Sequence, residues 1–491
     1  MFKRLLQIYA LPVLLSLGYT LGLGFWDYLL EVKDFPIFII IFILNIYFFI
    51  FIKQCRFIAL KSILIFCCLL LVAYIASATG FLQGHMSLGI MASVLQTNQN
   101  EALEFLSVIH LKYWIYGFCL LLLSLYYFFV QPLYYSIRLR KLPAFFLLGL
   151  NVFNIFSVQT IAATIKYQKE EKKLNAENSP NADWKISSIQ PKYDNQIVII
   201  GESVERDFLS FYGYDKKTTP FLDQAPVTRV KQYISTAPNT ATSLIRTLAY
   251  MNPQRDIDVG LNVVTLAKQA KYNTIWISNQ GFLGKNDTTV SKIAIHADHT
   301  FFMKTGNYMS NNIDDDKLLD IVEKQLEKYK NRNNVIFIHM MGSHPDACER
   351  LFKQPRLYPD QSEAINCYLS SINKLDHFIE QTYNILSKSK RSFHLSYFSD
   401  HGMTVTSDGY NVDNKFKHNY DVPFFMLSSD EKKRVDVDKT ISAYDFMNIY
   451  AGFLGVKTPY LDANRDLEHI PNNDHVLVFD WDNYVSYQSL Q

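Results

Sequence analysis

The sequence carries almost no net charge, because 48 lysines and arginines face 46 aspartates and glutamates, which leaves a formal charge of +2. Such a chain lacks the basic excess that is typical of proteins that bind nucleic acid, so we expect no nucleic-acid partner. Its mean hydropathy is near zero, but this average joins an apolar first third to a more polar remainder. We therefore interpret the two parts separately.

Charge is absent from five runs within the first 165 residues, and each run is long enough to cross a membrane as a helix. The shortest has 18 residues and would measure about 27 Å, close to the thickness of the hydrocarbon core of a bilayer. No small-residue cleavage site follows the first run, which argues against a signal peptide. Residues 1–165 are predicted to form a transmembrane domain whose five helices cover Leu5–Trp26, Phe35–Ile52, Ser62–Gly84, Tyr113–Ile137 and Leu142–Ile165.

Basic residues lie at alternate ends of these runs. Lys3 and Arg4 precede the first run, and further basic clusters separate the second run from the third and the fourth from the fifth. By the positive-inside rule these ends are cytoplasmic, so an odd number of spans places the rest of the chain outside. Helical apolar spacing in residues 85–112 predicts an amphipathic loop on the outer side, and the charged residues 166–195 predict a juxtamembrane linker.

From residue 196 onward, short β-branched and aromatic runs alternate with helical stretches, which predicts one α/β domain over 196–491 with a mostly parallel central sheet. Chemically versatile side chains follow three of the predicted strands. Because the carboxyl ends of parallel strands meet at one edge of a sheet, we expect these side chains to converge. Carboxylate and imidazole together favour a zinc site. The residues are Glu202, His344, Asp400 and His401.

A hydroxyl at the start of a predicted helix is the candidate nucleophile. The polar run 238–243 precedes the apolar stretch 244–251, which is where helix N-caps occur. A threonine there would meet a phosphoryl group among backbone N–H donors, and a nearby metal ion would activate its hydroxyl. The segment by itself is better explained as a simple helix cap.

Several short motifs, in this order, resemble those of the membrane phosphoethanolamine transferases, a family in the alkaline phosphatase and sulfatase superfamily. The motifs are Gly201-Glu202-Ser203, Phe211-Tyr212-Gly213-Tyr214, Asn239-Thr240-Ala241-Thr242, Ser278-Asn279-Gln280-Gly281, Gly342-Ser343-His344 and Ser399-Asp400-His401-Gly402. The resemblance covers nearly the whole chain, including the five apolar runs. It implies a bacterial inner-membrane protein whose 196–491 domain is a periplasmic, alkaline phosphatase/sulfatase-like catalytic domain.

The resemblance also implies roles for individual residues. Four would hold a catalytic zinc ion (Zn²⁺), and the threonine among them would be the nucleophile: Glu202, Thr240, Asp400 and His401. Two histidines would move protons or hold the phosphoryl group: His344 and His418. Three residues would contact the substrate: Asn279, Gln280 and Lys285.

The implied reaction moves phosphoethanolamine from phosphatidylethanolamine to Thr240 and then to a hydroxyl of an envelope glycolipid. The acceptor would be either the lipopolysaccharide core or lipid A, and the protein would also contact membrane lipids. Asn239 stands where members that modify lipid A usually have glycine, which favours the core sugars. Met403 stands where many members have an acidic residue after Asp-His-Gly. Three alternatives remain: a phosphoglycerol transferase, a sulfatase-like phosphodiesterase, and a non-enzymatic membrane sensor with a degenerate domain, which the Met403 departure suggests.

Six cysteines are present, and two of them, Cys348 and Cys367, lie in the external domain. Because the compartment outside the membrane is oxidising, we predict that these two form a disulfide.

Overall fold

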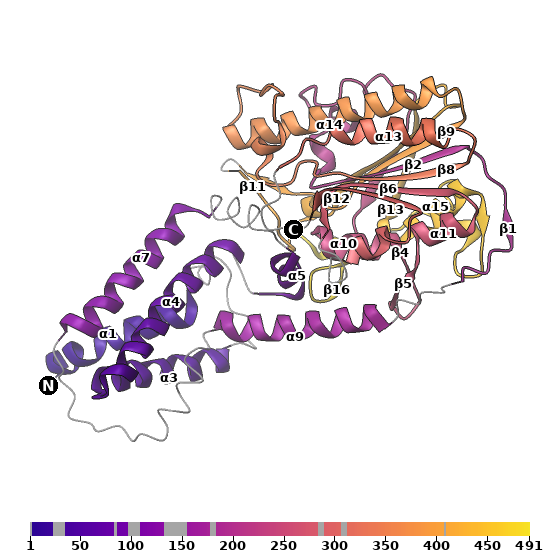
Figure 1. Cartoon of the computed structure of the whole chain (residues 1–491). Helices are drawn as coiled ribbons and strands as arrows, with labels where there is room; N and C mark the ends of the chain where they lie inside the picture. Colours follow the sequence, from indigo (N-terminus) through magenta and orange to yellow (C-terminus); the bar gives the residue numbers. More distant parts are fainter. Residues whose placement is uncertain are drawn as a thin grey trace. The chain divides into compact units, whose positions relative to one another are not determined.

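The computed structural model describes residues 2–22, 35–82, 86–96, 109–131, 155–176, 183–282, 289–305, 312–406 and 409–491. The chain divides into two compact units (Figure 1). The first consists of Met1–Met91 and Ala102–Gln168, and the second of Ala92–Glu101 and Lys169–Gln491.

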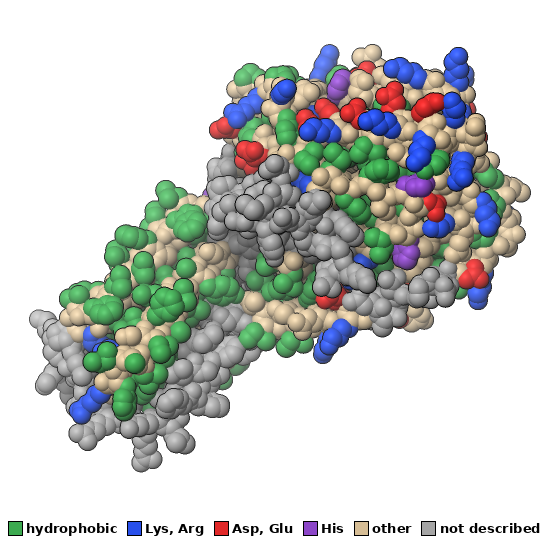
Figure 2. Space-filling model, in the orientation of Figure 1, with side chains coloured by type: hydrophobic (Ala, Val, Ile, Leu, Met, Phe, Trp, Pro, Cys, Tyr) green, Lys and Arg blue, Asp and Glu red, His purple; other side chains and the backbone are tan. Residues whose placement is uncertain are grey.

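The N-terminal part of the chain is helical. Its described helices are α1 (Phe2–Leu21), α3 (Phe35–Gln54), α4 (Ile58–Leu82), α5 (Leu88–Gln96), α7 (Leu111–Leu125), the π-helical turn η2 (Tyr126–Val130) and α9 (Ile155–Ala176). Large apolar side chains such as Ile58, Phe66 and Phe118 are exposed on these helices. Figure 2 shows hydrophobic side chains spread over this part, whereas most charged side chains in the view lie on the α/β domain.

Within the described residues, two helical stretches are long and apolar enough to cross a membrane, namely Ile58–Thr79 and Leu111–Val130. Tyr9–Leu21 and Phe38–Gln54 are apolar but shorter. Residues 142–154 of the fifth predicted span, and residues 97–108 of the predicted amphipathic loop, lie outside the described ranges. The prediction of five spans is therefore not confirmed.

An eight-stranded sheet forms the centre of the second unit, in the order β13-β3-β12-β9-β2-β8-β6-β7. Its strands are β2 (Asn195–Gly201), β3 (Thr228–Ile234), β6 (Asn273–Phe282), β7 (His299–Thr305), β8 (Asn334–His339), β9 (Phe393–Ser399), β12 (Asp421–Ser428) and β13 (Val435–Ser442). β12 is antiparallel to both of its neighbours, and every other adjacent pair is parallel. The expected mostly parallel sheet is confirmed. Since β3 and β9 both oppose β12, their carboxyl ends share one edge with those of β2, β8 and β6.

Helices cover both faces of the sheet (Figure 1). α13 (Lys317–Lys328) and α14 (Glu363–Lys388) lie on one face, and α10 (Thr240–Leu248), α11 (Val263–Gln269) and α15 (Phe446–Leu454) lie on the other. Strand β2 is buried throughout, so it supplies apolar side chains to both faces. Ile197 and Ile199 join the core under α14, whereas Val198 and Ile200 join the opposite core.

Shorter elements complete the domain. These are α12 (Thr289–Ala294) and four two-stranded pairs: β1 (Ser188–Ile189) with β14 (Val456–Lys457), β4 (Ala249–Met251) with β5 (Ile257–Asn262), β10 (Thr404–Thr406) with β11 (Gly409–Asn411), and β15 (Leu477–Phe479) with β16 (Tyr484–Ser486). The predicted disulfide is confirmed, because Cys348 and Cys367 are bonded with their Cα atoms 4.8 Å apart.

Candidate active site

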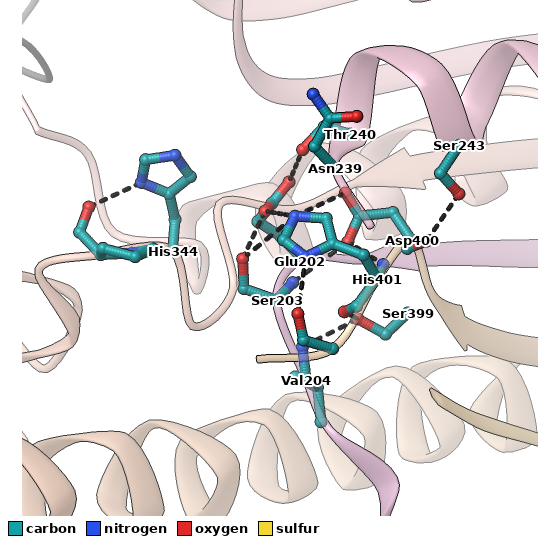
Figure 3. A network of polar contacts seen from close by, with 12 residues as sticks. Glu202, Ser203, Val204, Asn239, Thr240, Ser243, His344, Ser399, Asp400 and His401 are labelled. Atoms are coloured by element: carbon teal, nitrogen blue, oxygen red, sulfur yellow. Dashed lines mark hydrogen bonds and ion pairs between the residues drawn. The ribbon is translucent and has the colours of Figure 1, made fainter. Parts of the chain in front are cut away.

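Three buried side chains converge at the carboxyl edge of the sheet (Figure 3). Glu202 directly follows β2, while Asp400 and His401 follow β9, and the register pairs Gly201 with Ser399 just before them. One potential ligand atom from each of the three lies within 4.8 Å of the others. The adjacent parallel strands therefore bring together residues almost 200 positions apart, as the strand-end argument predicts.

Thr240 contacts this cluster from helix α10. It is the first residue of α10, and its Oγ donates to Oε2 of Glu202 at 2.9 Å. The second oxygen of Glu202, Oε1, lies 3.3 Å from Nε2 of His401. The Thr240 hydroxyl thus lies at the positive end of a helix, where a phosphoryl group would be stabilised.

Asp400 has one satisfied and one unsatisfied oxygen. Its Oδ1 accepts from the backbone N–H groups of Ser203, at 3.1 Å, and His401, at 2.7 Å. Its Oδ2 is buried and, among the residues that the structure describes, has no hydrogen-bond partner. Leaving such an atom unpaired costs free energy, and a cation would remove that cost. Oδ2 also lies 3.6 Å from Nε2 of His401.

The tautomer of His401 suits metal binding. Its Nδ1 lies 2.8 Å from the carbonyl oxygen of Gly402, which can only accept, so Nδ1 carries the proton. In the neutral ring the lone pair is then on Nε2, which faces Glu202 and Asp400. A histidine held through its other ring nitrogen is the usual form of a metal ligand.

The electrostatics of the cluster favour a bound cation. Burial raises the pKa of Asp400, and repulsion from Glu202 raises it further. Burial would lower the pKa of His401, but Asp400 and Glu202 raise it to about 9. Burial likewise opposes ionisation of Glu202, but the hydrogen bond and charge of His401 hold its pKa well below the usual range. Two carboxylates, an imidazole nitrogen and a hydroxyl fit Zn²⁺.

The loop after β8 approaches the backbone of Glu202 closely. Gly342 has φ +53°, and a Cβ atom there would lie 2.8 Å from the carbonyl oxygen of Glu202. Glycine permits both the backbone conformation and this approach. The same oxygen accepts from the Ser343 backbone N–H at 3.0 Å, which fixes the loop that carries His344.

Sequence reasoning assigned no role to the serines that support the cluster. The Ser203 hydroxyl donates to Glu202 Oε1 at 2.6 Å, and the Ser243 hydroxyl donates to the Asp400 carbonyl oxygen at 2.6 Å. Ser203 belongs to the Gly-Glu-Ser motif, so its place next to Glu202 in the sequence could have indicated this supporting role. No sequence signal pointed to Ser243, because it meets Asp400 only in the folded chain.

The two predicted histidines lie in neighbouring loops and not in the cluster itself. His344 has Nδ1 2.6 Å from the Pro345 carbonyl oxygen, and Figure 3 shows its ring beside the cluster. His418 lies in the 3₁₀ turn η6 (Lys417–Asn419), with Nδ1 3.2 Å from Oε1 of Glu205.

The structure describes two of the three residues that are predicted to contact the substrate, Asn279 and Gln280, and that role stays a prediction. Asn279 is fully buried, and its amide donates to Ile313 O at 2.7 Å and Asp315 Oδ1 at 2.8 Å. The Gln280 amide donates to Met340 O at 2.9 Å. The Asn279 bonds join the end of β6 to the segment before α13, and the Gln280 bond joins it to the residue that follows β8. Lys285 lies outside the described residues. Met403, which replaces the expected acidic residue, is fully buried in the core that includes α14.

Comparisons with known proteins agree with this fold. The sulfatase family model matches residues 194–456. Phosphoethanolamine transferase OpgE of Escherichia coli is 33% identical over 311 residues, which cover 62% of this chain and 58% of OpgE. A putative phosphoethanolamine transferase of Haemophilus influenzae is 32% identical over 349 residues, which cover 67% of this chain and 71% of the relative.

A solved structure is also similar. The C-terminal periplasmic domain of Escherichia coli EptC, in complex with Zn, superposes with a TM-score of 0.55 at 20% identity, covering 62% of this chain and 96% of that domain. At this identity the likeness concerns the fold alone. The sequence matches show that the chain belongs to the sulfatase family and, within it, to the phosphoethanolamine transferases.

Proposed function

We propose that this chain is a zinc-dependent enzyme that transfers phosphoethanolamine from phosphatidylethanolamine to an envelope glycolipid through a phosphothreonine intermediate at Thr240. The observation that carries the proposal is the position of the Thr240 hydroxyl, 2.9 Å from Glu202 and at the start of a helix. The names of OpgE and of the Haemophilus relative support the transferred group, and the zinc in the EptC structure supports the metal.

Glu202, Asp400, His401 and Thr240 would hold the metal ion. When bound, Zn²⁺ supplies positive charge that lowers the pKa of the nucleophile and offsets charge on the phosphoryl oxygens. Glu202 orients the Thr240 hydroxyl through its hydrogen bond. The Asp400 oxygen that lacks a hydrogen-bond partner among the described residues, and His401 Nε2, complete the ligand set.

The reaction takes two displacements. First, Thr240 Oγ gives up its proton and attacks the phosphorus of phosphatidylethanolamine, the bond to the diacylglycerol oxygen breaks, and that oxygen leaves as a hydroxyl with a proton. Second, an acceptor hydroxyl gives up its proton and attacks the phosphothreonine, the bond from phosphorus to Thr240 Oγ breaks, and Oγ takes up a proton. His344 and His418 are the groups that we assign to these proton transfers or to holding the phosphoryl group, because imidazole titrates in the useful range.

We further propose the topology and the acceptor. Residues 1–165 form five inner-membrane spans, residues 166–195 form a linker, and residues 196–491 form the periplasmic domain. Asn239, where lipid A-modifying members usually have glycine, favours the lipopolysaccharide core over lipid A as the acceptor. Protease added to spheroplasts should remove the 196–491 domain; cleavage only after the inner membrane is broken would contradict this orientation.

The decisive experiment traps the intermediate. The full chain, purified in detergent and incubated with phosphatidylethanolamine without acceptor, should carry phosphoethanolamine on the peptide that contains Thr240. Phosphatidylglycerol in a parallel incubation tests the phosphoglycerol alternative. The non-enzymatic alternative predicts no adduct from either lipid, and an adduct on Thr242 would overturn the nucleophile assignment. Mass spectrometry of envelope glycolipids with and without the gene would identify the acceptor.

A further inference from the structure

A second cluster of titratable groups lies beside the turn that carries Asp400 and His401. Potential ligand atoms of Glu205, Asp207 and His418 lie within 4.8 Å of one another. The Glu205 side chain is completely buried, whereas those of Asp207 and His418 are 53% and 55% exposed. Glu205 Oε1 lies 3.2 Å from His418 Nδ1.

The fold holds Glu205 in this place through its backbone. The Glu205 N–H donates to the Tyr368 hydroxyl at 2.9 Å, and that hydroxyl donates to the Ser203 carbonyl oxygen at 3.0 Å. A Cβ atom on Gly402 would lie 3.3 Å from Glu205 Cβ and 2.1 Å from the His418 carbonyl oxygen. The Asp-His-Gly turn therefore packs against both members of the pair.

Glu205 differs from the other acidic residues nearby in its partners. Asp207 accepts from Arg206 Nε at 2.8 Å. Asp421 lies 3.8 Å from Arg206 Nη1 and accepts from the Tyr487 hydroxyl at 2.7 Å. Among the described residues, His418 is the side chain that is bonded to the Glu205 carboxylate, and Glu205 Oε2 has no partner.

Burial of an ionised carboxylate in this position costs free energy. Burial raises the pKa of Glu205 to about 7, and repulsion from Asp207 and Asp421 adds to the effect, although His418 opposes it. The hydrogen bond to Glu205 in turn raises the pKa of His418 against the smaller effect of burial, helped by the charges of Asp421 and Asp207. Paired titratable groups with perturbed pKa values, next to residues that can bind a metal ion, are typical of functional sites.

The bond selects one tautomer of His418. When Glu205 is ionised its carboxylate oxygen can only accept, so Nδ1 carries the proton, and the Nε2 of the neutral ring has the free lone pair. We infer that Glu205 is a positioning residue: it holds His418 so that Nε2 takes the proton of the acceptor hydroxyl, or returns one to the leaving oxygen. The inference rests on the proposed function, since it assumes that His418 moves a proton. Glu205 thus places a carboxylate beside the Asp-His-Gly turn, where Met403 provides none.

The test compares Glu205→Gln, His418→Gln, the double variant and the control Asp207→Asn, each as full chain in detergent. Asp207→Asn removes a neighbouring negative charge that is bonded to Arg206 and not to His418. We expect His418→Gln to lower the transfer rate about 100-fold or more, and Glu205→Gln about 10-fold or more. In the double variant the loss should equal that of His418→Gln alone, because Glu205 acts only through His418. Asp207→Asn should cost much less than Glu205→Gln.

A second readout does not depend on activity. Diethyl pyrocarbonate modifies neutral imidazole, so peptide mass spectrometry of modification against pH reports the titration of His418. In the wild-type protein the midpoint for His418 should lie above that of N-acetylhistidine, and in Glu205→Gln it should move to lower pH. If Glu205→Gln does not fold, the wild-type midpoint still decides, because a value equal to that of N-acetylhistidine overturns the inference.

The possible failures can be told apart. Wild-type activity in His418→Gln would remove His418 from the proposed function. Loss of activity in His418→Gln, together with an unchanged rate and an unchanged His418 midpoint in Glu205→Gln, would overturn this inference alone. A different result would identify the cluster as a metal site and overturn the positioning role. In that case Asp207→Asn and Glu205→Gln would lose equal activity, the wild-type protein would bind a divalent cation stoichiometrically, and each of the two variants would abolish that binding.

Discussion

The hydroxyl of Thr240 donates a hydrogen bond of 2.9 Å to Glu202, a residue 38 positions earlier in the chain. The neighbouring hydroxyl of Thr242 is buried and donates to the Asn239 side chain. The structure therefore separates the two threonines: one faces the carboxylate cluster, and the other is bonded to the side chain of Asn239, the residue that precedes α10.

The first prediction follows from this difference. Thr240→Ala should lower the transfer rate by about 10³-fold or more, because the nucleophilic oxygen is lost. Thr240→Ser should keep part of the activity, since it keeps that oxygen. Thr242→Ala should keep most of the activity and lower the free energy of unfolding by about 1 kcal/mol, because a buried hydrogen bond to the Asn239 side chain is lost. Comparable rates for Thr240→Ala and the wild type would show that Thr240 is not the nucleophile.

The second prediction concerns the metal. The purified chain should contain about one zinc ion in the cluster of Glu202, Asp400 and His401, and a chelator should abolish transfer and lower the thermal midpoint. Glu202→Gln should weaken zinc binding by more than about 100-fold, because a ligand matters more than a neighbour of a ligand. Metal analysis and equilibrium dialysis measure both effects. Full activity without bound metal would contradict the proposal.

The zinc affinity of the metal-free protein should also depend on pH. The pKa of His401 is raised to about 9, so at neutral pH this ring must release a proton before Nε2 can bind a metal ion. The apparent affinity should therefore increase as the pH rises from 7 towards 9. Dialysis at several pH values would test the sign, and an affinity that falls over this range would contradict it.

The disulfide gives a prediction for stability. Cys348 and Cys367 are 19 positions apart, and a loop of this length corresponds to a stabilisation of about 3 kcal/mol. Cys348→Ser should lower the free energy of unfolding by roughly that amount and make it insensitive to reductant. Cys119→Ser, which removes an exposed free cysteine, is the control and should change little.

Asp376 should make stability depend on pH. This buried carboxyl on α14 accepts from the backbone N–H groups of Phe221, at 2.7 Å, and Leu222, at 3.1 Å. Burial raises its pKa to about 7, so between pH 4 and pH 7 the folded chain keeps a proton that the unfolded chain has lost. Its contribution to stability is therefore present at low pH and is lost as the pH rises through 7. In Asp376→Asn the thermal midpoint should fall less between pH 5 and pH 8 than in the wild type, and an identical fall would contradict the assignment.

The sequence by itself determined the features that depend on local pattern. Uncharged runs marked the apolar N-terminal part, and alternating strand and helix patterns marked the α/β domain. The rule that parallel strand ends share an edge brought Glu202 next to Asp400 and His401, because adjacent buried strands leave few alternatives. Cys348 and Cys367 were the two cysteines of the predicted external domain, and they form the expected disulfide.

Only the tertiary structure decided the contacts between segments without a shared pattern. Glu205 and His418 are 213 positions apart, and they meet because β12 runs antiparallel beside β9 and brings η6 onto the Asp-His-Gly turn. The Asn279 amide, near the end of a buried strand, donates to Asp315, which lies 36 positions later in the segment before α13. Such pairings depend on loop paths and on the burial of each polar atom, which a linear pattern of residues does not contain.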